Sequence, residues 1–504
     1  MRLLFKPASR HEPDQMTKME SILFTHSYFL KLDPKQLKIG QPYAPLGTLY
    51  AAALMRENGY EVLLHDVQFA NGPESIVPAL VQKLPKYFVV YDDGFNYLTK
   101  MCLTNMRDAA FKMIRLAKET GCIVIVSSSD STDRFEKYLE CGADFVLIGE
   151  GEQSLLELVE GLESGKEDLS AIAGISYKTK EAIVKTKTRK VMTELDCLPQ
   201  PAWDLIDMRP YKEMWLKHAG FFSINIGTTR GCPFKCNWCA KPIYGNRYNA
   251  RSPQNVVNEI KYLKKRFEID HIWFCDDIFG LKPGWVAEFA QLMKENGLKI
   301  KFKIQSRADL LVQEGYVSAL GLAGCENVWM GAESGSQKIL NAMDKGITIQ
   351  QIEKATMLLK KHGIRPSFFI QFGYLGETIT DIKQTIKMIN RLMPSEIGIS
   401  VSYPLPGTGF YEKVKEELKE KANWTHSDEL ALMFRNTYQP EFYKKLHLYV
   451  HTNFRIRLAY QSLRFLLKYP LKWNLDRFKK AIAGLYVLPS LLYTKAKLWQ
   501  LQRA

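Results

Sequence analysis

Three cysteines in one short stretch of the chain have the spacing of a metal-cluster site. Cys232, Cys236 and Cys239 form a C-x3-C-x2-C pattern within TTRGCPFKCNWCAKP. Three thiolates so close in sequence can bind one inorganic core, and cysteine thiolates are the usual ligands of iron–sulfur clusters. Because a cubane cluster has more irons than these ligands, one iron stays open to a small chelating molecule. The spacing therefore predicts a catalytic [4Fe-4S] cluster.

A structural zinc ion is the alternative for the same cysteines. It would need a fourth Cys or His to close its tetrahedron. The nearest further candidates, Cys275, His218 and His271, all lie outside the cysteine loop. The amino terminus, MRLLFKPASR, lacks the features of a secretory signal, so a cytoplasmic location with reduced thiols is expected. A disulfide framework is therefore not expected for the nine cysteines.

Repeated strand and helix patterns surround the cysteine loop. Six apolar, strand-like runs alternate with helical stretches between about residues 202 and 408. The expected strands cover residues 222–227, 271–275, 301–305, 327–332, 367–372 and 396–402. The expected helices lie near residues 253–267, 284–296, 309–322, 349–362 and 378–392. This α/β order predicts a partial (β/α)6, TIM-like barrel whose active site lies at the loops that follow the strands.

Polar side chains and a glycine directly follow several of these strands. Asp276 and Asp277 follow the second strand, Arg307 the third, Glu333 the fourth and Gly373 the fifth. The C-terminal ends of barrel strands meet at one mouth, so these residues are expected to lie close together. Each also has an ordinary structural explanation, as a helix N-cap, an ion-pair partner or a turn residue. Their joint occurrence favours a binding role.

The cysteine pattern in this setting resembles the radical S-adenosylmethionine (SAM) superfamily. The signature of that family has an aromatic residue before its last cysteine, and Trp238 occupies that position here. The resemblance implies that the open iron chelates SAM and that Asp277, Arg307, Glu333 and Gly373 lie near the cofactor. It also implies reductive cleavage of SAM to methionine and a 5′-deoxyadenosyl radical. The electron would come from a reductant such as flavodoxin or ferredoxin.

Residues 1–165 show a second alternation of strands and helices. RLLF (2–5), EVLLHDV (61–67), YFVVY (87–91), CIVIVSS (122–128) and ADFVLIG (143–149) have the pattern of strands. Apolar, β-branched runs between helices predict a doubly wound, Rossmann-like parallel sheet that is covered on both faces. Such sheets bind ligands at the C-terminal ends of their strands. Residues 166–201 are expected to form a linker with a small hairpin.

A doubly wound domain before such a barrel resembles the cobalamin-binding subgroup of the superfamily. The matching stretches are PYAPLGTLYAAALMRENGYEV and ADFVLIGEGEQSLLELV. The resemblance implies a bound cobalamin, with Ser127, Ser129, Gly149 and Gly151 as candidate contacts. Helix capping is the alternative role for the hydroxyls of the run SSSDST. A purely structural domain is the alternative for the whole region.

One feature of that subgroup is missing from the chain. Its members often carry D-x-H-x-x-G, whose histidine binds cobalt from below, and none of the nine histidines here has that setting. After YFVVY the chain reads Asp92, Asp93, Gly94 and Phe95. Some members of the subgroup lack the histidine and leave the lower face to water or to nothing. The resemblance therefore implies cobalamin without a protein histidine ligand.

These features together predict a radical SAM enzyme. The leading hypothesis is cobalamin-dependent methylation of an unactivated carbon in a small-molecule or lipid-like substrate. A cobalamin-dependent cyclase or rearrangement enzyme is the first alternative. A methylthiotransferase acting on transfer RNA would need a second cluster, but Cys102, Cys122 and Cys141 are widely spaced. A non-catalytic cobalamin or redox sensor would not need polar residues at so many strand ends.

The net charge of +15 is concentrated at the C-terminal end. Residues 442–504 contain about thirteen Lys or Arg but only one acidic residue, Asp476. The rest of the chain is nearly neutral, so nucleic-acid binding is not expected. Residues 409–504 are expected to be helical, either as a cap on the barrel mouth or in peripheral contact with the inner membrane surface. Their longest uncharged stretch, residues 481–494, is too short to span a bilayer.

Overall fold

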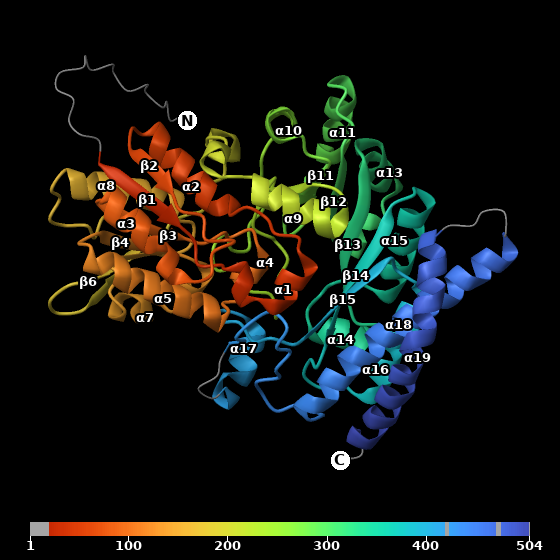
Figure 1. Cartoon of the computed structure of the whole chain (residues 1–504). Helices are drawn as coiled ribbons and strands as arrows, with labels where there is room; N and C mark the ends of the chain where they lie inside the picture. The colour runs from red at the N-terminus through yellow and green to blue at the C-terminus, as the bar shows by residue number, and fades with distance from the viewer. Residues whose placement is uncertain (1–19, 419–422, 470–474, 503–504) are drawn as a thin grey trace.

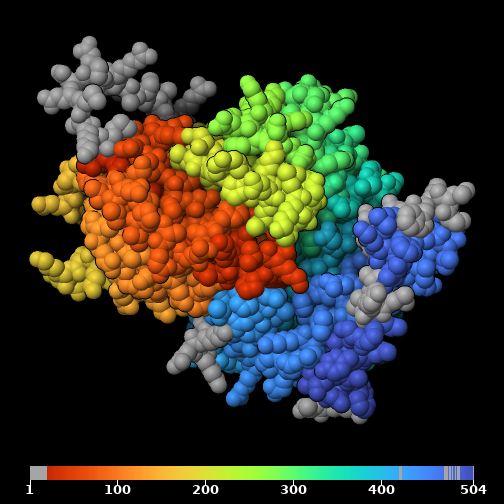
Figure 2. Space-filling view, in the orientation of Figure 1, coloured from red at the N-terminus to blue at the C-terminus, as the bar shows by residue number. Residues whose placement is uncertain are grey.

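Two parallel sheets and a C-terminal pair of long helices make up the chain (Figure 1). The computed structural model describes residues 20–418, 423–469 and 475–502. Figure 2 shows the first sheet domain in orange, the second in green and the C-terminal region in blue, packed against one another. Short 3-10 turns lie at Leu30–Leu32, Pro73–Ile76, Leu195–Cys197, Trp203–Leu205 and Lys415–Glu417.

The first sheet consists of strands that are buried on both faces. Its five parallel strands are β1 (Ser21–Thr25), β2 (Glu61–Leu64), β3 (Tyr87–Tyr91), β4 (Ile123–Ser127) and β5 (Phe145–Leu147). They pair in the order β2-β1-β3-β4-β5, which is the flavodoxin-like arrangement. The expected doubly wound sheet is therefore confirmed. The order reverses between β1 and β3, and sheets of this kind bind ligands at that reversal.

Helices cover both faces of this sheet and account for its continuous apolar strands. One hydrophobic core lies beneath α2 and α8, and a second lies beneath α3, α5 and α7. These helices are α2 (Leu46–Glu57), α3 (Val77–Lys83), α5 (Thr104–Glu119), α7 (Phe135–Glu140) and α8 (Glu152–Glu163). Three short helices follow strands or loops of the domain: α1 (Pro34–Ile39), α4 (Tyr97–Lys100) and α6 (Ser129–Asp133).

One strand of this sheet lies where the sequence pattern predicts none. The strand expected at RLLF (2–5) lies outside the described residues, and the central strand β1 at Ser21–Thr25 was not anticipated. The hairpin expected between residues 166 and 201 consists of β6 (Ile175–Lys178) and β7 (Ile183–Lys185). It adds two antiparallel strands to the edge of the sheet beside β5.

The second sheet confirms the six expected barrel strands. They are β8 (Ser223–Ile226), β11 (His271–Phe274), β12 (Lys301–Ser306), β13 (Cys325–Glu333), β14 (Arg365–Phe372) and β15 (Glu396–Val401). Neighbouring strands pair in parallel, and their order in the sheet follows the order along the chain. No pairing joins β8 to β15 within the described ranges, so the barrel is open along one side. This is the partial TIM-like barrel that the sequence predicts.

Helices cover the outer face of this sheet. They are α10 (Pro253–Phe267), α11 (Trp285–Glu295), α12 (Ala308–Leu311), α13 (Glu314–Ala323), α14 (Gln337–Ala342), α15 (Ile349–Lys361) and α16 (Ile379–Leu392), with α9 (Arg209–Ala219) ahead of β8. Local signals set their starts: Ser252 caps α10 ahead of Pro253, and Thr348 forms a capping box at α15. A two-stranded ribbon, β9 (Thr229–Arg230) with β10 (Asn249–Ala250), encloses the cysteine loop.

The C-terminal region is helical, as expected. After α17 (Gly409–Val414), the long helices α18 (Pro440–Lys468) and α19 (Leu475–Leu501) lie side by side (Figure 1). α18 packs against α16 and β15 through buried residues that include Leu446, Val450 and Phe454. None of the helices in the described part of the chain is long and apolar enough to cross a bilayer.

Candidate active site

The cysteine loop projects from the C-terminal end of the first barrel strand. Cys232 is buried, Cys236 and Cys239 are partly exposed, and all three thiols are free. Gly231 permits the entry to the loop, because a Cβ there would lie 2.3 Å from the Arg247 carbonyl oxygen. Burial raises the pKa of Cys232 and raises the pKa of Cys239 to about 11. No three Cys, His, Asp or Glu side chains among the described residues lie close enough together to bind one ion, and this holds for the three loop cysteines as well.

Asn237 anchors the cysteine loop to the rest of the barrel. Its amide group donates hydrogen bonds to the Ala342 carbonyl oxygen at 2.8 Å and to Asp344 at 2.7 Å. The Tyr374 hydroxyl donates to the side-chain amide oxygen of Asn237 at 2.6 Å. The backbone N–H of Asn237 donates to the Met343 carbonyl oxygen, and the backbone carbonyl oxygen of Asn237 accepts from the Phe410 N–H. The loop is therefore held in place before any cluster binds, by a residue that the sequence did not single out.

Arg307 lies against the cysteine loop, as the sequence predicts for a residue after the third strand. Its guanidinium carbon is 3.6 Å from the ring centroid of Phe234, which stands between the first two cysteines. Its Nη2 donates to the Lys345 carbonyl oxygen at 2.9 Å, and its Nε pairs with Asp309 at 3.0 Å. The side chain is 4% exposed. A fixed positive charge therefore lies beside the proposed cluster ligands.

Glu333 is also buried at the mouth, but it already has a partner. Its carboxylate pairs with the Lys345 ammonium at 2.7 Å, and both side chains are buried. The Lys345 ammonium lies 5.6 Å from the Trp238 ring centroid. Trp238 leaves its buried Nε1 without a hydrogen-bond partner. The structure thus brings Trp238, Arg307 and Glu333 together around the cysteine loop, and it adds Lys345 to them.

The two neighbouring aspartates after β11 have different roles. Asp276 is 1% exposed and accepts hydrogen bonds from the backbone N–H groups of Thr228 and Thr229, at 2.7 and 2.8 Å, so it stabilises the turn ahead of the cysteine loop. Asp277 instead pairs with Lys100 of the first domain at 2.8 Å. Its charge acts on Cys232 and Cys239. Asp277 therefore lies where the first domain meets the cysteine loop.

Gly373 has a positive φ of 76° after β14 and faces the C-terminal region. A Cβ there would lie 3.3 Å from the Tyr443 ring. Its N–H donates to Glu377 at 2.6 Å, and its carbonyl oxygen accepts from the Asn436 amide. The other Glu377 oxygen is buried without a partner, and burial raises the pKa of this carboxyl to about 8.

Glu377 makes the stability of the protein depend on pH. Because its folded-state pKa of about 8 exceeds the unfolded value of 4.5, its favourable contribution is complete below pH 4.5 and is lost as the pH rises to 8. We expect Glu377→Gln to unfold at a higher urea concentration than the parent protein at pH 8, and at a similar one at pH 5. Glu167→Gln, at an exposed carboxylate, serves as the control. A difference that does not change with pH would contradict this assignment.

A narrow cleft of about 10 Å³ separates the first domain from the cysteine loop. Gly94, Lys100 and Ser129 line one wall. The other wall is the cysteine loop and the end of β11, with Gly231, Lys241, Pro242, Ile243, Tyr244 and Asp277. The Ser129 hydroxyl is buried and has no hydrogen-bond partner. The strand ends of the first sheet and those of the barrel thus face each other.

The other first-domain candidates lie around this cleft in different ways. A Cβ on Gly149 would lie 3.6 Å from the Ile243 carbonyl oxygen, so Gly149 faces the cysteine loop closely. Gly151 packs on Ser127 and Tyr91, and neither it nor Ser127 is among the cleft residues. The capping role that the run SSSDST suggests is taken by Ser128, which forms a capping box at α6.

Asp92 and Asp93, which replace the missing histidine, are both engaged in the fold. Asp92 accepts hydrogen bonds from the N–H and hydroxyl of Ser27 at 2.7 and 2.8 Å. Asp93 accepts from the N–H groups of Gly47 and Phe95. Burial raises the pKa of Asp93 to about 6. Asp92 thus holds the loop after β3 to the residues that follow β1, Asp93 holds it to the start of α2, and Gly94 remains at the cleft.

A buried ionic cluster joins the first domain to the cysteine loop. Arg230 stands two residues ahead of Cys232 and is 2% exposed. Its guanidinium pairs with Glu152 at 2.6 Å and also with Glu150, and both carboxylates are buried. The rings of Tyr50, Phe95 and Tyr244 surround it. The sequence assigned the IGEGE stretch to cofactor contact through its glycines and missed this role of its glutamates.

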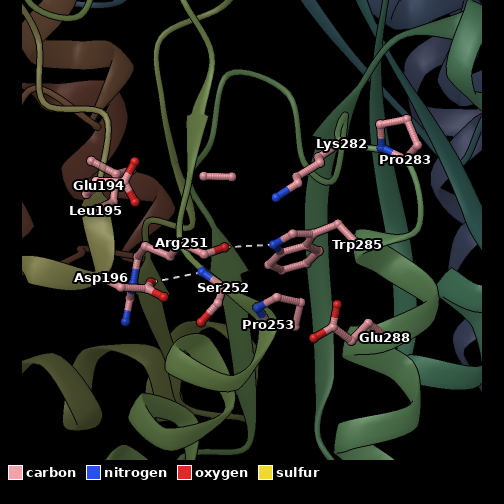
Figure 3. Close-up of a pocket in the computed structure, with 11 residues that line it drawn as sticks. Glu194, Leu195, Asp196, Arg251, Ser252, Pro253, Lys282, Pro283, Trp285 and Glu288 are labelled. Atoms are coloured by element: carbon pink, nitrogen blue, oxygen red, sulfur yellow. Dashed lines mark hydrogen bonds between the residues drawn. The ribbon is translucent and has the colours of Figure 1, made fainter. Parts of the chain in front are cut away.

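A larger cavity of about 270 Å³ lies away from these residues (Figure 3). It opens between the linker and the starts of α10 and α11. Asp196 accepts a hydrogen bond from the Ser252 N–H there, and the Trp285 indole donates to the Arg251 carbonyl oxygen. None of the site residues predicted from the sequence lines this cavity.

Comparison with known proteins identifies the family. The model of the radical SAM superfamily matches residues 226–389, which include the cysteine loop. An uncharacterized methyltransferase of Pyrococcus horikoshii is 30% identical over 393 residues, which cover 77% of this chain and 82% of that protein. The chain belongs to the radical SAM superfamily. As such it is an enzyme that uses a [4Fe-4S] cluster and SAM.

Two further radical SAM relatives cover much of the chain. The anaerobic magnesium-protoporphyrin IX monomethyl ester cyclase of Rubrivivax gelatinosus is 25% identical over 76% of this chain and 68% of its own length. The cobalamin-dependent S-adenosylmethionine radical enzyme OxsB, solved with aqua-cobalamin bound, gives a TM-score of 0.72 at 18% identity. That likeness covers 95% of this chain and 72% of OxsB, and it extends the shared fold to the first domain.

Proposed function

We propose that this radical SAM enzyme binds cobalamin between its two sheets and methylates an unactivated carbon of a small-molecule or lipid-like substrate. The observation that carries the proposal is the cleft in which Gly94 and Ser129 of the first domain face Gly231 and Asp277 of the barrel. A flavodoxin-like sheet binds its ligand at this end, and a barrel reacts at this end. A cofactor held by both would meet the cluster directly.

The residues present fit the cofactors in specific ways. Cys232, Cys236 and Cys239 would hold the cluster, and Arg307 with the Glu333–Lys345 pair would provide polar contacts to SAM. When bound, SAM supplies a carbon-centred radical and cobalamin supplies a methyl group. The unpartnered Ser129 hydroxyl and the glycine at position 94 would allow the corrin to approach the first domain. Asp92 and Asp93 are already hydrogen-bonded, so they would hold the loop after β3 in place rather than bind cobalt.

The cleft has to widen to admit a corrin. Its volume of about 10 Å³ is far below the roughly 300–1,000 Å³ of sites for drug-sized molecules. The Lys100–Asp277 pair spans it, with side chains 23% and 33% exposed. Partly exposed pairs contribute only about 0–1 kcal/mol, so opening this contact costs little. Movement of the first domain away from Asp277 is therefore part of the proposal.

Peripheral membrane contact through the C-terminal helices extends the proposal to lipid-like substrates. Tyr460, Leu467 and Leu492 on α18 and α19 are 65%, 75% and 62% exposed. Basic residues share these helices, and such a combination is typical of interfacial helices. Liposomes of anionic lipid that do not retain the full-length protein would contradict this part.

Anaerobic reconstitution with iron, sulfide and hydroxocobalamin tests the central proposal. We expect one corrin and one cluster per chain, measured by absorption spectroscopy and metal analysis, and 5′-deoxyadenosine on addition of SAM and a low-potential reductant. With methyl-deuterated SAM, we expect the label to reach the bound cobalamin, as mass spectrometry would detect. A cluster without corrin uptake would contradict the cobalamin assignment.

A cyclase or rearrangement enzyme is the second candidate, supported by the likeness to the Rubrivivax cyclase. In that case cobalamin would bind and 5′-deoxyadenosine would form, but no deuterated methyl group would reach cobalamin. The labelling experiment therefore separates the two activities.

A further inference from the structure

The inner face of the barrel sheet is not packed in the way its outer face is. Along β13, Val328 and Met330 face the helices and are fully buried, whereas Trp329 between them is only partly buried. Along β14, Phe368 and Ile370 are buried, whereas Phe369 is 36% exposed. Successive residues of a strand point to opposite faces, so Trp329 and Phe369 lie on the inner face. Closed TIM barrels fill this space with branched apolar side chains.

Only half of this inner face is covered by the first domain. Over β8 and β11, the Tyr43 hydroxyl bonds to Ser223 at 3.2 Å, its ring lies 4.6 Å from that of Trp273, and the Ala44 carbonyl oxygen accepts from Asn225. Ser223, Asn225 and Trp273 are consequently buried. Over β12 to β15, Asn327, Ser367 and Gln371 are also buried, but other inner residues stay partly or fully exposed. We call these residues the open inner face: Lys303, Gln305, Trp329, Phe369, Gly398 and Ser400.

The centre of the open inner face is a stacked pair of aromatic rings. The rings of Trp329 and Phe369 stack with centroids 4.7 Å apart and an angle of 28° between their planes. Gly398 pairs with Phe369 in the sheet, and a Cβ there would lie 3.2 Å from the Trp329 ring and 3.4 Å from the Phe369 ring. The glycine therefore allows the rings to lie close to the backbone of β15. Aromatic faces arranged in this way favour another planar ring.

A lysine ammonium stands at the edge of this surface, within electrostatic reach of the Glu326 and Glu396 carboxylates. Lys303 is a diagonal neighbour of Trp329 on the adjoining strand, because Lys303 pairs with Asn327 and Gln305 pairs with Trp329. Its ammonium lies 5.4 to 5.9 Å from the ring centroids of Tyr43, Trp215 and Trp273. It has no ion pair or hydrogen bond within the described part of the chain. Burial lowers its pKa to about 8.

The open inner face adjoins the proposed radical site. Gly331 pairs with Phe369 across the two strands, and a Cβ on Gly331 would lie 2.5 Å from the Lys345 ammonium. Lys345 in turn lies against Trp238 of the cysteine loop. A molecule on the aromatic surface would therefore extend toward the residues around SAM.

We propose that the open inner face binds the substrate as a planar aromatic or conjugated ring system that stacks on Trp329 and Phe369 and directs a carboxylate to Lys303. This inference rests on the proposed function, because it names the substrate class of the same active site. The surface is aromatic at its centre, where Gly398 leaves room for the two rings, and cationic at one edge. An aliphatic or uncharged substrate would use only part of it.

Binding of 2-naphthoate to the full-length, anaerobically reconstituted protein tests this inference. Equilibrium dialysis should show affinity at least about tenfold higher for 2-naphthoate than for cyclohexanecarboxylate, which is not planar, or for the uncharged 2-naphthamide. Phe369→Ala and Gly398→Val should each lower the affinity for 2-naphthoate by about tenfold. Trp329→Phe should keep that affinity within about threefold of the parent protein. Lys303→Met should bind naphthoate and naphthamide equally. Tyr460→Ala, at an exposed ring on α18, is the control and should match the parent protein.

Two results would overturn the inference. The first is a parent protein that binds the three probes equally. The second is a folded Phe369→Ala and Trp329→Ala pair of variants that retain full naphthoate affinity. If Gly398→Val does not fold, Phe369→Leu tests the contribution of the stacked rings to 2-naphthoate binding with a smaller change. SAM cleavage and corrin uptake by the parent protein are measured separately, so a failed substrate inference remains distinct from a failed functional proposal.

Discussion

Replacing Cys232, Cys236 and Cys239 together with alanine should remove the iron and lower 5′-deoxyadenosine formation by at least about 1,000-fold. The cluster delivers the electron that cleaves SAM, and no uncatalysed route replaces it at a comparable rate. The loop itself should survive the change, because Asn237 holds it through hydrogen bonds to Ala342 and Asp344 rather than through the cysteines. Iron analysis and absorption spectra after anaerobic reconstitution measure the loss directly.

The matched control is Cys197→Ala, which changes an exposed cysteine in the linker. It should keep the full iron content and activity. Cys275→Ala tests the zinc alternative further, because Cys275 is the next cysteine along the chain after the loop and is buried after β11. Retention of a full cluster by the triple variant, or iron loss from Cys197→Ala, would refute the assignment of the cluster to this loop.

The barrel and the cluster ligands could be predicted from sequence because their signals are local. Six apolar runs separated by helical patterns correspond to β8 and β11 to β15, and three cysteines in eight residues need no long-range contact to be recognised. The first sheet was predicted for the same reason. Its strand β1 was missed because the short run at Ser21–Thr25 is followed by no long helix and competes with RLLF nearer the amino terminus.

The contacts that join the domains could not be predicted, because each pairs residues far apart in the chain. Lys100 and Asp277 are separated by 177 positions, and Arg230 and Glu150 by 80. Two adjacent aspartates also have different roles, because Asp276 stabilises a turn whereas Asp277 faces the cleft. The sequence does not show this difference. Local patterns identified the residues proposed to hold cofactors, and tertiary packing decided which residues lie around them.

The second large effect is expected from Arg230→Met. It would leave the buried carboxylates of Glu150 and Glu152 without their cation, and breaking a buried ion pair from one side typically costs about 3–5 kcal/mol. We expect the midpoint of the first unfolding transition to shift to a lower concentration of guanidinium chloride. Iron loading should fall with it, because Arg230 lies two residues ahead of Cys232 and ties the cysteine loop to the first domain.

A variant that lacks all three charges separates the loss of the ion pairs from the cost of burying unpaired carboxylates. Arg230→Met combined with Glu150→Gln and Glu152→Leu removes all three charges from a site lined by Tyr50, Phe95 and Tyr244, and should recover most of the stability that Arg230→Met loses. Arg209→Met breaks an exposed pair with Asp207 and should change the unfolding free energy by less than about 0.5 kcal/mol. If Arg230→Met unfolds like the parent protein, or if the triple change is no more stable than the single one, the buried cluster does not hold the domains together. Stability recovered without iron loading would instead mean that the charge of Arg230 itself positions the cysteine loop.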